Sequence, residues 1–216
     1  MSGKTRRYLV ILALALAAGA RAEGGDLQYW NEFIFEAPLR ERLDLETAFE
    51  QNWVDDANVF SLYNFTLEPS YRAGDRWSLG PGYRWEQELE EGEWLTENRY
   101  WLHLSLKGEA FGWKAKFKPL IEYRDLEGDD VWRFRPKLKI KRPLDLGSIQ
   151  LTPYFAEDPF YVLEDGQWKQ NRATAGFSFE PVEHLELSIY YMNVAKESDD
   201  GWYANHVIGT EIVFGF

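Results

Sequence analysis

Apolar and polar residues alternate with period two over long segments of this chain, and no other feature restricts its fold as strongly. Residues 132–141 show the pattern clearly, because every odd position from Arg133 to Lys141 is basic. The even positions form the apolar face: Trp132, Phe134, Pro136, Leu138 and Ile140. Successive side chains of a β-strand point to opposite faces, so the pattern predicts two-faced strands and an all-β fold.

Eleven segments of the chain carry this alternation. They are residues 27–37, 41–51, 58–71, 76–89, 94–108, 112–124, 130–141, 148–157, 168–180, 184–194 and 204–216. Strands of soluble proteins have about 5–6 residues, whereas a tilted strand that crosses a bilayer needs about 9–11. The lengths therefore favour a transmembrane antiparallel up-and-down β-barrel.

The connections between the segments differ in length and chemistry. Four are short: residues 72–75, 108–112, 142–147 and 181–184. Five are mostly longer and acidic: residues 52–57, 87–94, 125–130, 158–167 and 195–203. Outer-membrane barrels have short periplasmic turns and longer outer loops, so we predict that the acidic connections lie outside. A soluble lipocalin-like barrel is the alternative, but it leaves a chain with 17% aromatic residues unexplained.

Tryptophan residues gather toward the ends of the segments, where the aromatic girdles of a membrane barrel lie. They are Trp30, Trp85, Trp94, Trp113, Trp132, Trp168 and Trp202.

The first 22 residues predict a cleaved secretory signal peptide. A basic start is followed by an apolar run and by the sequence Gly-Ala-Arg-Ala at residues 19–22, which suits signal peptidase. Cleavage leaves residues 23–216 as a single barrel domain. It removes four of the 24 basic residues and none of the 36 acidic ones, so the net charge falls from −12 to −16. That charge argues against a nucleic-acid partner, and the absence of cysteine excludes disulfides and thiolate sites.

The last segment ends the chain on an aromatic residue that continues an apolar face. Its predicted assembly signal consists of Ile208, Ile212, Phe214 and Phe216. This ending resembles the carboxy-terminal signal that the barrel assembly machinery recognises, and it predicts insertion into the outer membrane of a Gram-negative bacterium. Because bacterial single-chain barrels have even strand numbers, we expect ten or twelve strands, with residues 27–37 not a full strand or one segment containing two.

Several stretches resemble a known family. They are Asn98–Leu106 (NRYWLHLSL), Trp132–Ile140 (WRFRPKLKI), Thr152–Tyr161 (TPYFAEDPFY), Gln170–Phe179 (QNRATAGFSF), Leu187–Met192 (LSIYYM) and Asn205–Gly209 (NHVIG). The family consists of small Gram-negative outer-membrane barrels classified only as a domain of unknown function. The resemblance implies the fold and the location and brings no activity or catalytic residue with it.

If the apolar faces meet lipid, the charged faces meet the lumen. The predicted basic wall consists of Arg99, His103, Lys107, Lys114, Lys116, Lys118, Arg124, Arg133, Arg135, Lys137 and Lys139. The predicted acidic wall consists of Asp44, Glu46, Glu50, Glu86, Glu186 and Glu211. Paired walls would make a purely structural barrel, whereas a ladder of basic side chains would make a small porin-like passive channel that prefers anions.

An outer-membrane lipid-modifying enzyme with a site at the outer rim is the alternative function. His206 is the one histidine placed to act as its base, and an interfacial ring is the simpler interpretation of that residue. The sequence predicts no catalytic residue, no metal site and no cofactor. The acidic runs at residues 125–130 and 197–200 favour solvated loops over calcium sites. The expected partners are outer-membrane lipid and lipopolysaccharide, the assembly machinery and a small anionic solute, and we expect a monomer.

Overall fold

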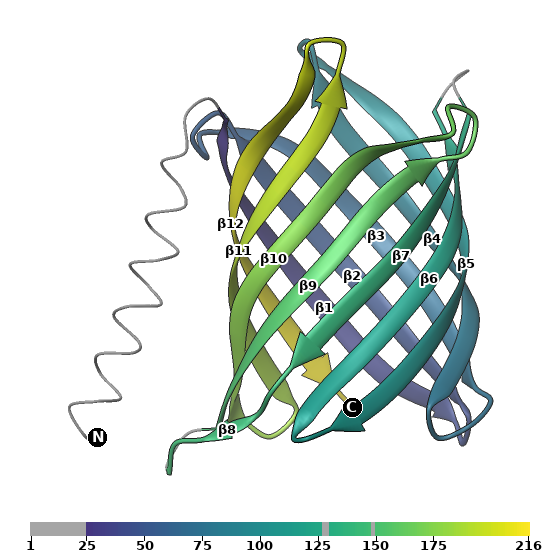
Figure 1. Cartoon of the computed structure of the whole chain (residues 1–216), viewed down its shortest axis with the longest axis vertical. Helices are drawn as coiled ribbons and strands as arrows, with labels where there is room; N and C mark the ends of the chain where they lie inside the picture. Colours follow the sequence, from purple (N-terminus) through teal and green to yellow (C-terminus); the bar gives the residue numbers. More distant parts are fainter. Residues whose placement is uncertain (1–24, 127–129, 148–149) are drawn as a thin grey trace.

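Eleven long strands close into a β-barrel in the computed structural model, which describes residues 25–126, 130–147 and 150–216 (Figure 1). The strands are β1 (Leu27–Arg40), β2 (Leu43–Val54), β3 (Val59–Arg72), β4 (Trp77–Glu90), β5 (Glu93–Ala110), β6 (Trp113–Asp125), β7 (Val131–Lys141), β9 (Gln150–Val162), β10 (Gln167–Val182), β11 (Leu185–Ser198) and β12 (Gly201–Gly215). A two-residue strand, β8 (Leu144–Asp145), pairs with the start of β9. The predicted signal peptide lies outside the described residues.

All eleven predicted segments are strands, and the all-β barrel is confirmed. Neighbouring strands pair antiparallel except at one place, where β1 pairs parallel to β12 from Leu27↔His206 to Glu36↔Gly215. We call this pair the seam. The expectation of ten or twelve strands is wrong, because the segment at residues 27–37 is a full barrel strand. An odd number of alternating strands closes only if its first and last strands run in the same direction, and the seam meets that condition.

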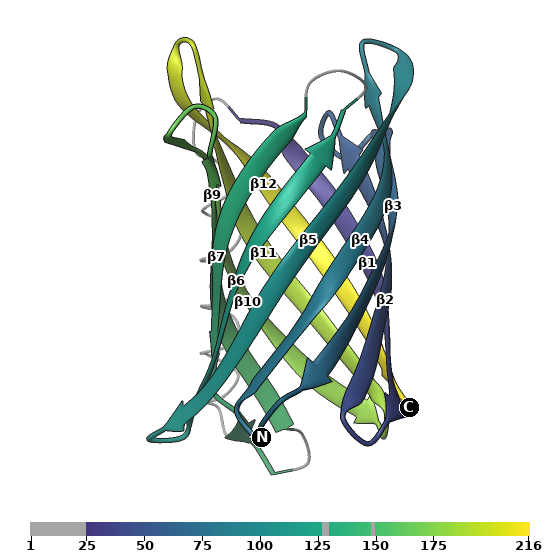
Figure 2. The ribbon, with the colours of Figure 1, turned by 90° about the vertical axis from the view of Figure 1, so that its right-hand side faces the viewer.

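The seam places the start of β1 and the end of β12 at opposite ends of the barrel, which we call the Leu27 end and the Phe216 end (Figures 1 and 2). The β2–β3, β4–β5, β6–β7, β9–β10 and β11–β12 connections lie at the Leu27 end. The expectation of longer loops there is wrong, since the β4–β5 and β11–β12 connections have two residues each. Many acidic residues that the sequence placed in loops continue the strands instead. The turn between β4 and β5 consists of Glu91 and Gly92, whose φ values of 51° and 90° are those of the tight primed turns that suit twisted hairpins.

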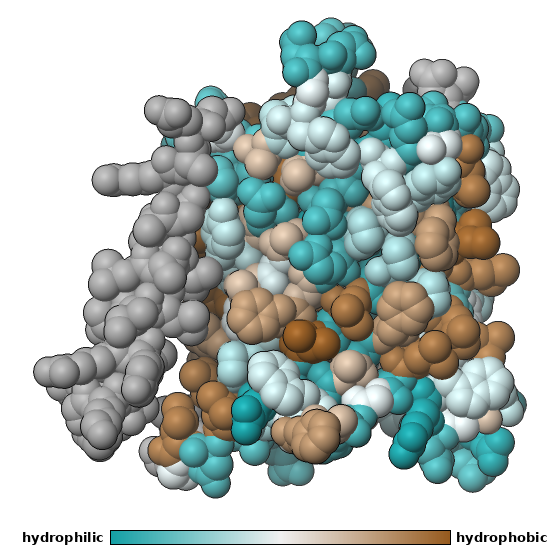
Figure 3. Space-filling model, viewed as in Figure 1, coloured by the Kyte–Doolittle hydropathy of each residue, from teal (hydrophilic) through white to brown (hydrophobic). Residues whose placement is uncertain are grey.

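The barrel buries polar side chains and exposes apolar ones. Among the described residues, thirty large hydrophobic side chains are exposed, whereas eight hydrophobic and seventeen polar or charged residues are buried. Leu102 on the outside is 70% exposed, and Glu122 on the inside is 1% exposed. Hydrophobic side chains gather across the middle and lower part of the face in Figure 3, and the hairpins at its top are hydrophilic. No described residues form a helix long and apolar enough to cross a membrane.

Aromatic side chains contact one another around the outside of the barrel toward the Leu27 end. One series of contacts runs through Tyr29, Trp53, Phe60, Trp94 and Tyr63 to Trp85. A second runs through Tyr83, Tyr100, Tyr123 and Trp132. Trp30 departs from the predicted girdle, because its even position in β1 turns its ring into the interior, where it packs beside Arg172.

Two interior aromatic rings pack directly against glycine residues. A Cβ atom at Gly82 would lie 2.0 Å from the Trp101 indole, and one at Gly209 would lie 2.0 Å from the Tyr190 ring. Each ring therefore lies flat over a strand that has no side chain at that point. This packing of an aromatic ring over a glycine fixes the register of neighbouring strands.

Candidate functional site

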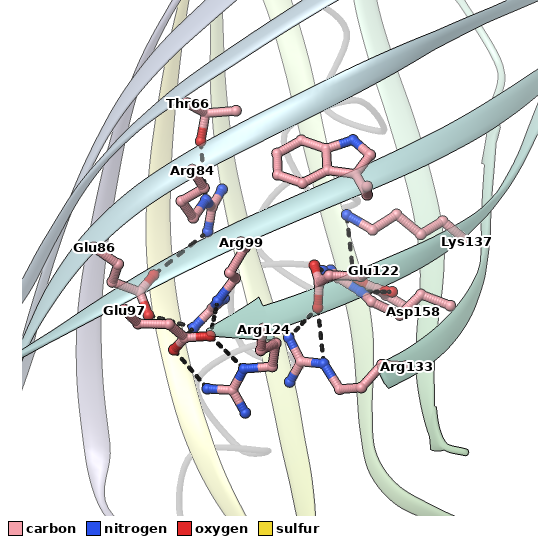
Figure 4. A network of polar contacts seen from close by, with 12 residues as sticks. Thr66, Arg84, Glu86, Glu97, Arg99, Glu122, Arg124, Arg133, Lys137 and Asp158 are labelled. Atoms are coloured by element: carbon pink, nitrogen blue, oxygen red, sulfur yellow. Dashed lines mark hydrogen bonds and ion pairs between the residues drawn. The ribbon is translucent and has the colours of Figure 1, made fainter. Parts of the chain in front are cut away.

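A belt of ion pairs runs along part of the inner wall of the barrel near the Leu27 end (Figure 4). Every second side chain of a strand faces inward. The alternation in the sequence therefore places the charged side chains of neighbouring strands together on the inside. The belt consists of Glu86, Glu97, Arg99, Glu122, Arg124, Arg133, Arg135 and Asp158. Its strands are β4, β5, β6, β7 and β9, which are neighbours in the sheet.

Glu97 is the centre of the first half of the belt. Arg99 donates from Nε and Nη2 to its two carboxylate oxygens at 2.6 and 2.8 Å. Arg124 donates from Nη2 at 2.6 Å from the neighbouring strand. Arg99 also donates to Glu86, so one guanidinium joins two carboxylates. Planar guanidinium groups suit such two-point contacts with carboxylates.

Glu122 is the centre of the second half. Arg133 donates from Nε at 2.8 Å, and Arg135 donates from Nη1 at 2.6 Å. Arg135 also contacts Asp158 at 2.7 Å. The guanidinium carbons of Arg135 and Arg133 lie 4.1 and 5.0 Å from the centre of the buried Phe160 ring. The ring and the carboxylates together compensate charges that burial alone would make very unfavourable.

A second group of pairs lies deeper toward the middle of the barrel. Glu68 accepts hydrogen bonds from Lys118 Nζ at 2.5 Å and from Trp101 Nε1 at 2.9 Å. His103 is buried, with Nδ1 3.7 Å from Glu68. Arg84 Nη1 is 3.3 Å from Glu50. These contacts join strands that are not neighbours, so they cross part of the lumen.

The half of the barrel toward the Phe216 end is hollow. A cavity of about 1040 Å³, which we call the vestibule, is lined by interior residues of β1, β2, β5–β7 and β10–β12 and reaches the β10–β11 turn at His184. A smaller cavity of about 330 Å³ lies deeper and shares Lys116, Lys139 and Glu211 with the vestibule. Glu122 and Arg135 of the belt line this deeper cavity, so the open space reaches the belt from the Phe216 end.

The predicted basic wall divides between the belt and the vestibule. Arg99, Arg124, Arg133 and Arg135 lie in the belt, and Lys118 and Lys137 contact Glu68 and Asp158. Lys107, Lys114, Lys116 and Lys139 line the vestibule.

The predicted acidic wall divides in the same way. Glu86 lies in the belt, Glu50 contacts Arg84, and Glu46, Glu186 and Glu211 line the vestibule. Asp44 stands apart, at the Phe216 end, where it contacts Arg72 at 3.0 Å.

The sequence analysis missed the carboxylates that neutralise the belt, namely Glu97, Glu122 and Asp158. Glu97 and Glu122 were detectable, because each shares the parity of basic residues in its own segment: Glu97 with Arg99, and Glu122 with Arg124. Asp158 was not, because it was assigned to a loop and in fact lies in β9.

His206 lies on the outer face of β12. The Tyr191 hydroxyl group is 2.6 Å from its Nδ1, and the two rings stack. Within the described residues no group of three or more His, Asp or Glu side chains is arranged to hold a metal ion. The acidic run at residues 125–130 lies partly outside the described residues.

The predicted assembly signal lies on the outer face of the seam. Phe214 stacks on Phe35 with 5.0 Å between ring centres. Phe216 is 73% exposed, and its backbone N–H donates to Glu36 O at 2.9 Å. The last side chain therefore contributes little packing, while its backbone completes the strand.

Comparison with known proteins adds one match. No curated protein matches the chain. A family model described as "Protein of unknown function (DUF2490)" matches residues 27–205, which extend from the first residue of β1 into β12 and include both the belt and most of the vestibule. The chain therefore belongs to the DUF2490 family.

Proposed function

We propose that this chain is an outer-membrane β-barrel of a Gram-negative bacterium, exported by a cleaved signal peptide, and that it acts as a structural barrel closed to ions. The observation that carries the proposal is the inverted distribution of side chains. Exposed leucine and aromatic residues cover the outside, and buried carboxylate and guanidinium groups fill the inside. A surface of this kind suits lipid and is unfavourable in water.

The closed state rests on the ion-pair belt. Paired side chains of the belt fill the interior beside β4–β9, and an ion that displaced a pair such as Arg133–Glu122 would have to break a buried pair, which costs about 3–5 kcal/mol. The vestibule then admits water and solutes from the Phe216 end as far as the belt. We place that end in the periplasm, because it holds Phe216, the last residue of the predicted carboxy-terminal assembly signal.

Single cysteines test the location and the orientation, since the chain has no native cysteine. Asp200→Cys lies in the β11–β12 turn and Glu183→Cys in the β10–β11 turn, at opposite ends. In whole cells, a membrane-impermeant maleimide should label Asp200→Cys and should reach Glu183→Cys only after the outer membrane is permeabilised. Equal labelling of both variants in intact cells, or of neither in permeabilised cells, would contradict the proposal.

Conductance in a planar bilayer tests the closed state. The wild-type barrel should give no steady conductance. Replacing Glu122 and Arg133 together with Ser removes a balanced pair and leaves Arg135 with Asp158, so this variant should conduct. The matched control replaces Lys169 and Glu197, a balanced pair at 2.6 Å beyond the belt, and should stay silent. Steady wild-type conductance would refute the closed barrel.

A small anion-preferring passive channel is the second candidate, favoured by the lysine side chains of the vestibule. A wild-type barrel that conducts should then show an anion-selective reversal potential in a salt gradient. Lys116→Glu with Lys139→Glu should reverse that selectivity. The two residues suit this test better than Arg133 and Arg135, whose charge reversal would disrupt the pairs with Glu122.

A further inference from the structure

Lysines stand directly opposite lysines on three neighbouring strands. The register pairs Lys107 with Lys116 across β5 and β6. Across β6 and β7 it pairs Lys114 with Lys141, Lys116 with Lys139, and Lys118 with Lys137. Like charges in directly opposite positions destabilise a sheet. Within residues 25–126, 130–147 and 150–216, no carboxylate lies within 4.0 Å of Lys107, Lys114, Lys116, Lys139 or Lys141.

The opposite side of the interior has the same unfavourable register with the other sign. Glu32 stands opposite both Glu50 and Glu211. Glu46 stands opposite both Glu36 and Glu68. Among the described ion pairs, none involves Glu32, Glu36, Glu46 or Glu211. Two sets of strands on opposite sides of the barrel, β5–β7 and β12 with β1–β3, thus each keep like charges together.

One cavity separates the two sets. The vestibule is lined on one side by Lys107, Lys114, Lys116, Lys139 and Lys141, and on the other by Glu36, Glu46, Glu186 and Glu211. Glu109 stands among the lysines at the rim. The space of about 1040 Å³ matches the upper range of small-molecule sites, about 300–1,000 Å³. The walls attract each other's charge but do not meet, so a solute between them can contact both.

We propose that the vestibule binds a small zwitterion, a short peptide with free termini, with its carboxylate against the lysine wall and its ammonium group against the glutamate wall. An anion alone would leave the glutamates unpaired and would be repelled by them. A divalent cation is disfavoured, because the described carboxylates do not converge as metal ligands. This binding requires the folded interior and goes beyond the structural role proposed above, since it holds whether or not the belt conducts.

Four forms of one peptide test the proposal by calorimetry on the full folded barrel in detergent. They are trialanine, N-acetyl-trialanine, trialanine amide and the doubly blocked peptide, which differ in their terminal charges and little in their apolar surface. Trialanine should bind most tightly, each singly blocked form about tenfold more weakly, and the doubly blocked form not measurably, because each charged terminus makes its own charge-assisted contacts.

Variants assign each terminus to a wall. Lys116→Gln with Lys139→Gln should weaken trialanine and N-acetyl-trialanine, so that N-acetyl-trialanine binds no more tightly than the doubly blocked form, and should leave the binding of trialanine amide unchanged. Glu46→Gln with Glu211→Gln should abolish the preference for a free ammonium group. Lys169→Gln, outside the vestibule, should change nothing. Wild-type protein that binds all four peptides equally, binds none, or binds N-acetyl-trialanine as tightly as trialanine would overturn the proposal.

Discussion

One carboxylate of the belt, Glu122, neutralises two buried charges, so we expect its removal to destabilise the barrel strongly. Glu122 is 1% exposed and neutralises two guanidinium groups, Arg133 and Arg135. Among the described residues, Arg135 also pairs with Asp158, whereas Arg133 pairs with Glu122 alone. Removing Glu122 would therefore leave the Arg133 charge buried without a carboxylate partner, which is the costly half of breaking a buried pair.

We expect Glu122→Gln to lower the free energy of unfolding by about 3 kcal/mol. Glu93→Gln removes one carboxylate from the exposed start of β5 and should change it by less than about 0.5 kcal/mol. Urea unfolding of the barrel in lipid, followed by tryptophan fluorescence, measures both. Equal midpoints for the two variants would show that the belt contributes nothing specific.

Gly209 offers a second prediction at this scale. Its Cβ would lie 2.0 Å from the Tyr190 ring, whereas nothing lies within 4 Å of a Cβ at Gly215 in the same strand. Gly209→Ala should therefore cost about 1–3 kcal/mol through overpacking, and Gly215→Ala should be neutral. The same unfolding experiment compares them, and a neutral Gly209→Ala would mean that the ring moves aside freely.

At the scale of elements, period two was sufficient to find all eleven barrel strands and to decide which face of β7 is basic. The alternation failed near strand ends, where the side chains become acidic although the backbone still pairs as a strand. Residues 87–90, which include Glu88 and Glu90 and resemble a loop in sequence, continue β4 because backbone pairing with β5 persists to Glu90↔Glu93. For the same reason Asp158 was taken for a loop residue, and one carboxylate of the belt was missed. Which lysines find partners was not predictable, because it depends on strand register and tilt.

Changes at the end of the carboxy-terminal strand can distinguish an effect on assembly in cells from an effect on the stability of the folded barrel. Phe216→Ala keeps the backbone hydrogen bond to Glu36 and removes an exposed ring, so refolding in detergent should be unchanged. In cells, the same variant should insert several-fold less protein into the outer membrane, and Phe216→Tyr should restore insertion. Fractionation with a heat-modifiability gel measures the folded amount. Wild-type insertion of Phe216→Ala would remove the terminal-signal hypothesis.

At the scale of the whole molecule, the parallel seam determines how the barrel closes. Phe35 and Phe214 face each other across it with stacked rings. The double variant Phe35→Cys with Phe214→Cys should form a disulfide on mild oxidation, because directly opposite residues meet the Cβ spacing that the bond requires. Phe35→Cys with Ile212→Cys lies two residues out of register and should cross-link poorly. Faster migration of the oxidised chain on a denaturing gel identifies the bond, and the reverse preference would contradict the register.

The seam also sets an order on folding. Tyr29 and Asn31 form hydrogen bonds with Thr210 across about 180 residues of chain, whereas each of the other pairings between long strands joins strands that follow one another in the chain. Hairpins close short loops early, and the contact of highest sequence separation carries the largest entropic cost and forms late. Until then the chain is an open sheet whose two outermost strands present unpaired backbone groups, a template for pairing with another copy. Delay at this last step, more than loss of any hairpin, is where we expect this barrel to aggregate.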